Sequence, residues 1–305
     1  MLTLARRRVL AVILGSAATV GLAGGAGATP AQDLGVLVMA HGGDRVWNGE
    51  VSAMLEPLRR DYPLELAFGM ADPATLQEAV AKLEGRGVRR IAVVRLFISG
   101  ESWLERTEQI LGVRQGAPPR RADPHAGHGG HEGHDMTLWR IATAARFALS
   151  VEGLSEASEM GEVLAGRALG LSREPARESV LILAHGPEDD AENRRWLAQI
   201  DRRADAVRTA APFRQVRVET LREDWPEKRI ESEARIRSFV EAAARDGGAA
   251  IVIPYRVQGF GPYAKVLDGL TYVSDGRGLL PSPAVEHWVR RQVEALAKGP
   301  FRTQA

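Results

Sequence analysis

Short apolar runs alternate with longer segments of helical periodicity along most of this chain. The two runs that open each half of the pattern read VLVMAHGG at residues 36–43 and VLILAHGP at residues 180–187. Runs of this length, rich in Val, Leu and Ile, are typical of strands buried on both faces of a parallel sheet. A polar segment with helical character follows each run, at residues 44–60 or 189–208, so the pattern predicts a strand and a helix twice.

The rest of each copy repeats in the same order. Asp-Pro at residues 72–73 and Trp-Pro at residues 225–226 mark the starts of further helices, because proline fits the first helical turn. Gly85 and Gly247 mark the ends of these helices. The other predicted elements are extended segments at residues 64–70 and 216–222, strands at residues 91–100 and 250–259, and closing helices at residues 157–169 and 283–297.

Strands that alternate with helices in this way predict parallel sheets covered on both faces by right-handed crossovers. We therefore predict an α/β fold of two tandem doubly wound domains, residues 33–173 and 178–298, in a pseudo-twofold arrangement with one cleft between them. An insertion at residues 116–135 interrupts the first copy. Ligands of such sheets bind beyond the carboxyl ends of the strands, where His41 and His185 are expected to lie.

The first 28 residues have the pattern of a signal peptide. Arg6, Arg7 and Arg8 precede an uncharged stretch that ends in Ala-Gly-Ala at residues 26–28, a small-x-small cleavage pattern. We predict cleavage there and a periplasmic or secreted protein with no stable membrane insertion, the alternative being an uncleaved anchor. Because the arginines also fit a twin-arginine signal, the sequence leaves two export routes open.

Charge and composition narrow the function classes. The 305 residues include 40 Lys and Arg against 39 Asp and Glu, a net charge of +1 that gives no strong field for nucleic acid. The absence of Cys excludes disulfides and thiolate ligands and leaves His, Asp and Glu as candidate metal ligands. The sequence has no Gly-Lys-Ser/Thr pattern to cradle a phosphate, so no nucleotide cofactor is expected.

His41 and His185 are candidates for chemistry because each follows a predicted strand and precedes a glycine. An imidazole in that place is directed out of the core, where it can ligate a metal ion or act as a general base. The alternative is that each imidazole hydrogen-bonds to its own loop and caps the following helix.

The insertion carries four of the seven histidines, His125, His128, His131 and His134, in the sequence HAGHGGHEGH. A composition so rich in Gly and His cannot form a packed core, so these imidazoles can converge on a metal ion. We predict that the tract binds Ni²⁺, Cu²⁺, Zn²⁺ or Co²⁺, the alternative being a linker without a metal role.

Three motifs together resemble a known family. The strand-His-Gly openings, Glu-x-Ala-Phe with Asp-Pro at residues 65–73, and the Val-Val-x-Leu-Phe strand that runs into a Gly loop at residues 93–100 are similar to those of the class II tetrapyrrole chelatases. This family contains the sirohydrochlorin cobaltochelatases and ferrochelatases of the cobalamin and sirohaem pathways, and the chain resembles its tandem two-unit form. The resemblance implies a lyase that holds a divalent ion, Co²⁺, Fe²⁺ or Ni²⁺, through His41 and His185 and inserts it into a tetrapyrrole.

The chain departs from the family at its second metal-binding His, which belongs to a Gly-x-His loop. Residues 100–102 read Gly-Glu-Ser, and residues 259–261 read Gly-Phe-Gly. The site would then recruit Glu101, use the His of the other half, or no longer work as the family's does. Glu101 is the natural substitute because a carboxylate can ligate a cation and accept a proton, the alternative being a solvated loop acid.

We therefore predict an exported chelatase-like enzyme that inserts Co²⁺ or Fe²⁺ into a sirohydrochlorin-type tetrapyrrole. Its predicted catalytic residues are His41, His185 and Glu101, and the His-rich tract is its predicted metal supply. Trp103, beside the Gly100 loop, is the candidate to stack on the macrocycle. The alternative is a non-catalytic periplasmic protein that binds the metal or the tetrapyrrole on a chelatase fold. A monomer is expected to suffice, because the tandem already supplies two units.

Overall fold

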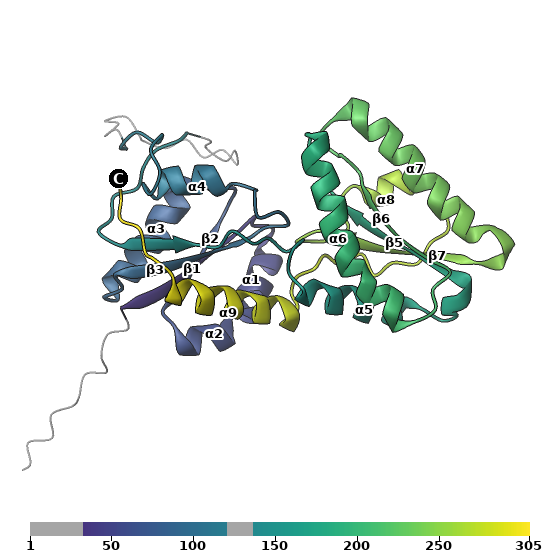
Figure 1. Ribbon diagram of the computed structural model, residues 1–305, viewed down its shortest axis with the longest axis horizontal. Coiled ribbons are helices and arrows are strands. Elements are labelled where there is room, and N and C mark those ends of the chain that lie inside the picture. Colours follow the sequence, from purple (N-terminus) through teal and green to yellow (C-terminus); the bar gives the residue numbers. More distant parts are fainter. Residues whose placement is uncertain (1–32, 121–136) are drawn as a thin grey trace, which may run out of the picture. The chain divides into compact units, whose positions relative to one another are not determined.

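The computed structural model describes residues 33–120 and 137–305, and two parallel sheets form the centre of this range (Figure 1). The first sheet has the order β2-β1-β3-β4, and the second has the order β6-β5-β7. The strands are β1 (Leu34–Ala40), β2 (Leu64–Phe68), β3 (Arg90–Leu96), β4 (Arg146–Leu149), β5 (Glu178–Ala184), β6 (Gln215–Thr220) and β7 (Ala249–Tyr255). Every pairing between them is parallel, so the predicted α/β class with two parallel sheets is confirmed.

Some of the predicted features lie outside the described residues. These are the signal segment, residues 1–28, and the histidines of the insertion, His125, His128, His131 and His134. Their roles stay predictions. Within residues 33–120 and 137–305, none of the helices has the length and apolar content needed to cross a membrane.

Alternate residues of the central strands enter different apolar cores. In β1, Val36 faces one core and Leu37 faces another. In β5, Val180 belongs to the same core as Val36, and Leu181 to a third. Both faces of each sheet are therefore covered, as the continuous apolar runs predict. The core that contains Val36 and Val180 is shared by the two sheets, and both sheets belong to one compact unit.

The helices follow the predicted order. They are α1 (Arg45–Met54), α2 (Glu56–Asp61), α3 (Pro73–Gly85), α4 (Leu104–Ile110), α5 (Glu159–Leu171), α6 (Asp190–Ala210), α7 (Pro226–Ala244), α8 (Tyr263–Val266) and α9 (Pro283–Lys298), with 3₁₀ turns at Pro175–Arg177 and Arg245–Gly247. The single helix predicted at residues 44–60 is instead two, because Pro57 has no N–H with which to continue the ladder of α1. The helix predicted to reach Gly247 ends at Ala244 and continues as a 3₁₀ turn.

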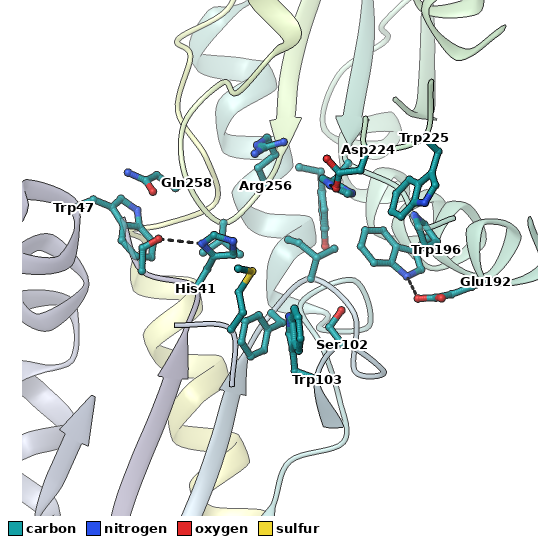
Figure 2. Close-up of a pocket in the computed structure, with 18 residues that line it drawn as sticks. His41, Trp47, Ser102, Trp103, Glu192, Trp196, Asp224, Trp225, Arg256 and Gln258 are labelled. Carbon is teal, nitrogen blue, oxygen red and sulfur yellow. Dashed lines mark hydrogen bonds and ion pairs between the residues drawn. The ribbon is translucent and has the colours of Figure 1, made fainter. Parts of the chain in front are cut away.

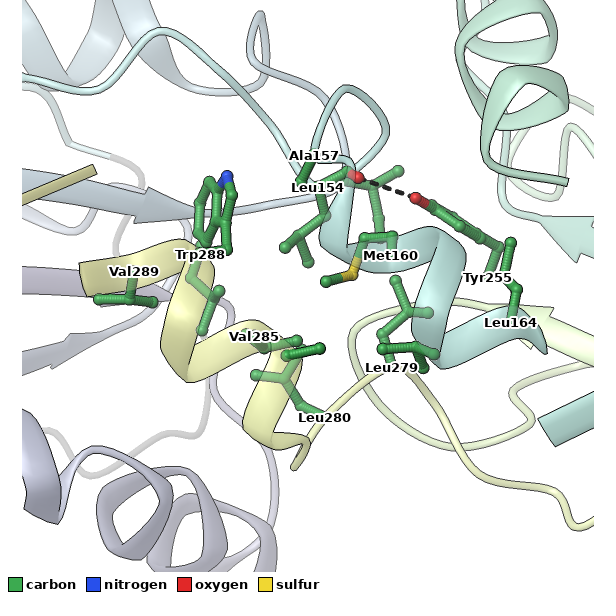
Figure 3. Close-up of a cluster of buried hydrophobic side chains, with 14 of the residues drawn as sticks. Leu154, Ala157, Met160, Leu164, Tyr255, Leu279, Leu280, Val285, Trp288 and Val289 are labelled. Atoms are coloured by element: carbon green, nitrogen blue, oxygen red, sulfur yellow. Dashed lines mark hydrogen bonds between the residues drawn. The ribbon is translucent and has the colours of Figure 1, made fainter. Parts of the chain in front are cut away.

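The closing helix of each copy packs across the repeat boundary. Helix α5, from the first copy, packs on α6 and β7, whereas α9, from the second copy, packs on β3 and β4. Figure 3 shows α5 and α9 in one apolar cluster, to which they contribute Met160 and Val285. The approach of α5 to α6 is close, because a Cβ added at Gly161 would lie 3.1 Å from the Cβ of Ala206. Trp288 of α9 is fully buried, and its Nε1 donates to Glu152 at 3.0 Å. The predicted boundary between residues 173 and 178 thus separates the repeats in sequence but not in packing.

Candidate functional site

The two strand-end histidines adopt the same local conformation. His41 follows β1 and His185 follows β5, and the next residue in each case, Gly42 or Gly186, has a φ near +80° (+83° and +79°) that favours glycine. The Nδ1 of His41 lies 3.0 Å from the carbonyl oxygen of Gly42, and that of His185 lies 2.7 Å from the carbonyl oxygen of Gly186. These contacts assign a proton to each Nδ1, so each Nε2 is the nitrogen that faces other groups.

Both histidines line one cavity of about 630 Å³, in the size range of small-molecule sites. Residues of both halves form its walls (Figure 2). Its walls are mostly aromatic and apolar, with Trp47, Met70, Phe97, Ile98, Trp103, Pro187, Trp196, Trp225, Tyr255 and Val257 among the lining residues. The predicted cleft between the halves is therefore present, and it brings His41, His185 and Trp103 together.

The surroundings of His41 are open and largely apolar. Within the described part of the chain, its Nε2 has no hydrogen-bond or ion-pair partner. Trp47, Met70 and Trp103 are among the first-half side chains that line the cavity with it. The second half also reaches this loop, because a Cβ added at Gly43 would overlap Oε1 of Gln258. His41 thus offers a lone pair on Nε2 to whatever enters the cavity.

The surroundings of His185 are charged. Its Nε2 lies 2.9 Å from Oδ2 of Asp224 and 3.3 Å from Oε1 of Glu223, and its ring meets Trp225 edge to face at 5.8 Å. The Glu223 side chain is only 8% exposed and also contacts the guanidinium of Arg256. Both ring nitrogens of His185 thus face protein oxygens, and its Nε2 is engaged by the second half itself.

The structure does not bring Glu101 to either histidine. Its two carboxylate oxygens accept hydrogen bonds from Nε and Nη2 of Arg195, at 3.0 and 2.9 Å. The Glu101 side chain is 57% exposed, and Glu101 is not among the residues that line the cavity. Its contacts are those of an exposed ion pair between the halves, which corresponds more closely to the solvated-acid alternative than to a metal ligand.

A buried arginine shapes the loop that carries Trp103. The guanidinium of Arg95, at the end of β3, donates to the carbonyl oxygens of Ser150 at 2.9 Å, Ser102 at 2.7 Å and Gly100 at 2.6 Å. Burial lowers the pKa of Arg95 to about 10. These bonds hold the loop in which Trp103 takes a left-handed conformation with φ of 59° and lines the cavity. In the sequence, this role of Arg95 could have been inferred from the presence of a charged residue within the apolar run of residues 91–100.

Glu192 is a cavity acid that the sequence did not reveal. Its carboxylate accepts a hydrogen bond from Nε1 of Trp196 at 3.2 Å. Burial, followed by the nearby Glu101 carboxylate, raises the pKa of Glu192. Its spacing three residues after Asp189 is that of a capping box, which suggests only a helix-capping role. Asp189 does cap α6, but the Glu192 side chain lies against the cavity instead.

The candidate metal-ligating side chains within the described residues do not form a complete metal site. Within residues 33–120 and 137–305, no three His, Asp or Glu side chains are grouped to hold a metal ion. The predicted metal-binding roles of His41 and His185 therefore rest on their position in the cavity. His287, on α9, has a side chain 69% exposed and is not a lining residue.

Comparison with known proteins gives a fold. No protein-family model matches the chain, and no curated protein matches it. The solved structure of SirB from Bacillus subtilis with Fe³⁺ matches with a TM-score of 0.62 at 15% identity, over 88% of this chain and 99% of that chain. The sirohydrochlorin chelatase SirB of Bacillus subtilis subspecies spizizenii, in complex with cobalt, matches with a TM-score of 0.57 at 12% identity, over 88% and 97% of the two chains.

A third match is a multi-domain protein of Deinococcus radiodurans that is described as structurally similar to chelatases. It gives a TM-score of 0.53 at 17% identity, and the match covers 88% of this chain but only 57% of that longer chain. At these identities the likeness concerns the fold alone. The protein therefore has a chelatase-like α/β fold, which agrees with the predicted fold class.

Proposed function

We propose that this protein inserts a divalent metal ion, Co²⁺ or Fe²⁺, into a tetrapyrrole bound in the cavity between its two sheets. The observation that carries the proposal is the Nε2 of His41, which has no partner among the described residues and opens into an aromatic-walled cavity of about 630 Å³. The chelatase-like fold supports the same reaction class, and sirohydrochlorin is the first macrocycle to test.

His41 is the residue proposed to bind the metal ion. A neutral imidazole suits Co²⁺ and Fe²⁺, and a single protein nitrogen holds such an ion weakly enough to surrender it to the four nitrogens of the macrocycle. The backbone contact of Nδ1 fixes the ring so that Nε2 carries the lone pair. His185, whose Nε2 is engaged by two carboxylates, is proposed to organise the second-half wall instead.

Insertion of a divalent ion releases two pyrrole protons, which need acceptors in the cavity. Glu192 lines the cavity, and its raised pKa makes it a better proton acceptor than an ordinary carboxylate. Trp103 and Trp225, from opposite halves, supply ring faces against which a planar macrocycle can stack. Export to the periplasm, and metal supply by the histidines of residues 125–134, are proposed from the sequence alone.

A carrier without turnover is the second candidate. It is favoured by the incomplete ligand set, because no three metal-ligating side chains are grouped within the described residues. Such a protein would bind the metal or the macrocycle and release it unchanged.

The deciding experiment mixes the purified protein and Co²⁺ without oxygen with a metal-free macrocycle, in one series sirohydrochlorin and in another the dicarboxylate mesoporphyrin, and follows the absorbance change of each macrocycle. We expect insertion faster than the uncatalysed rate, and loss of the acceleration in His41→Ala. His287→Ala removes an exposed imidazole that does not line the cavity, and it should insert at the rate of the unchanged protein. Binding without acceleration would select the carrier, and full activity in His41→Ala would remove His41 from the mechanism.

A further inference from the structure

We propose that the natural macrocycle carries few acidic groups, as in a dicarboxylate porphyrin, and is not an octacarboxylate such as sirohydrochlorin. This inference rests on the proposed function, because it concerns the ligand of the same cavity. It is carried by the charges of the cavity walls, where the described cations, Arg256 and Lys228, each already contact a protein carboxylate.

The main cavity has one permanent cation on its described walls, Arg256, against two acids, Glu192 and Asp224. Arg256 is already paired, because its Nη1 contacts the carboxylate of Glu223 and its guanidinium lies 5.5 Å from the ring centroid of Tyr263, although its buried Nε has no partner within the described residues. A ligand carboxylate would therefore have to compete with a nearly buried protein carboxylate for this guanidinium.

The adjoining cavity, of about 640 Å³, extends the same pattern. It shares Glu192 with the main cavity and adds Glu188 and Asp189 against one cation, Lys228. The ammonium of Lys228 lies 2.8 Å from Oδ1 of Asp190 and donates to the carbonyl oxygen of Glu188 at 2.7 Å. On the described walls, a ligand carboxylate would therefore meet no cation that lacks a protein carboxylate as a partner.

The other side chains of the cavity walls suit a flat aromatic ligand that makes few polar contacts. Figure 2 shows Trp103 on one side of the cavity and Trp196 and Trp225 on the other. Trp47 lines the cavity while 5% exposed, and its buried Nε1 donor has no partner among the described residues. That indole can donate one hydrogen bond, either to a neutral acceptor or to one carboxylate. Eight carboxylates in such surroundings would meet like charges and lose hydration without compensation.

The test measures binding of three metal-free porphyrins that share one ring and differ in acidity: mesoporphyrin with two carboxylates, coproporphyrin with four and uroporphyrin with eight. Equilibrium dialysis at mildly alkaline pH gives each Kd. We expect mesoporphyrin to bind on the order of tenfold more tightly than uroporphyrin, and added salt to narrow the difference by screening the repulsion.

Glu192→Gln is the matching variant, because it removes one wall charge while keeping an oxygen for the Trp196 indole. It should tighten uroporphyrin binding several-fold and change mesoporphyrin binding less. Glu294→Gln makes the same charge change at an exposed position of α9 that does not line the cavity, and it should leave the ratio of the two Kd values unchanged.

The outcomes separate this inference from the proposed function. Uroporphyrin binding as tight as mesoporphyrin binding would overturn the inference, while rapid metallation of sirohydrochlorin would still uphold chelation. A preference for mesoporphyrin without metal insertion would uphold the inference and refute the chelatase. Failure of every macrocycle to bind would overturn both.

Discussion

His41 and His185 follow matching strands and share one backbone conformation, yet their Nε2 atoms meet different surroundings. That of His41 has no partner within the described residues and shares its cavity with Met70 and Trp103. That of His185 lies within 3.3 Å of two carboxylates, one of which also holds Arg256. A repeated motif therefore preserves where an imidazole stands, while the residues that follow the neighbouring strand decide what it can do.

The largest expected effect separates the two histidines directly. We expect His41→Ala to slow metal insertion by about a hundredfold or more, because it removes the proposed metal ligand. His185→Ala should slow it by only about threefold, by an indirect effect on the wall. Initial rates measured with Co²⁺ and the macrocycle that binds most tightly give the comparison. Equal losses in the two variants would refute the division of roles.

For the stability of the protein we expect the reverse: a change beside His185 should lower the free energy of unfolding more than a change beside His41 does. Glu223→Gln leaves Arg256 without its carboxylate and His185 with one acid fewer, and it should lower the free energy of unfolding by about 2–4 kcal/mol. Met70→Leu changes the residue that follows β2 with its volume kept, and it should cost less than about 1.5 kcal/mol. Urea denaturation of both proteins measures the difference. A cost for Glu223→Gln no larger than that for Met70→Leu would mean that the charged network has no structural role.

Glu192, the acid in the second-half wall of the cavity, should make the stability of the protein depend on pH. The folded state raises the pKa of Glu192, through burial first and the Glu101 charge second, so the folded state binds this proton more tightly than the unfolded state does. Stability should therefore decline as the pH rises from the ordinary Glu value through the raised one. Glu192→Gln should flatten that decline slightly, whereas the exposed control Glu294→Gln should not. Urea midpoints across this pH range provide the check.

The smallest effect is expected at Glu101. Its bidentate pair with Arg195 is exposed, and such pairs contribute about 1 kcal/mol or less. Glu101→Gln should therefore change neither the urea midpoint nor the insertion rate by more than a small margin. A loss of insertion comparable to that of His41→Ala would instead establish Glu101 as the replacement for the absent second histidine.

The elements of the fold could be predicted because their causes are local. Apolar runs identified the strands, and proline and the capping Asp72 identified the start of α3. The partners of side chains could not be predicted, because they depend on packing between distant segments. Nothing in the sequence around Glu101 indicates Arg195, and nothing around His185 indicates Glu223. Helical periodicity likewise shows that α9 buries one face, but not that this face meets the sheet of the other repeat.

The crossing of α9 has a consequence for the order in which the chain can fold. Trp288 fills part of the core behind β1 and β3, yet α9 is synthesised after every strand of both sheets. The first repeat therefore keeps an apolar face unfilled until the ribosome has made the second.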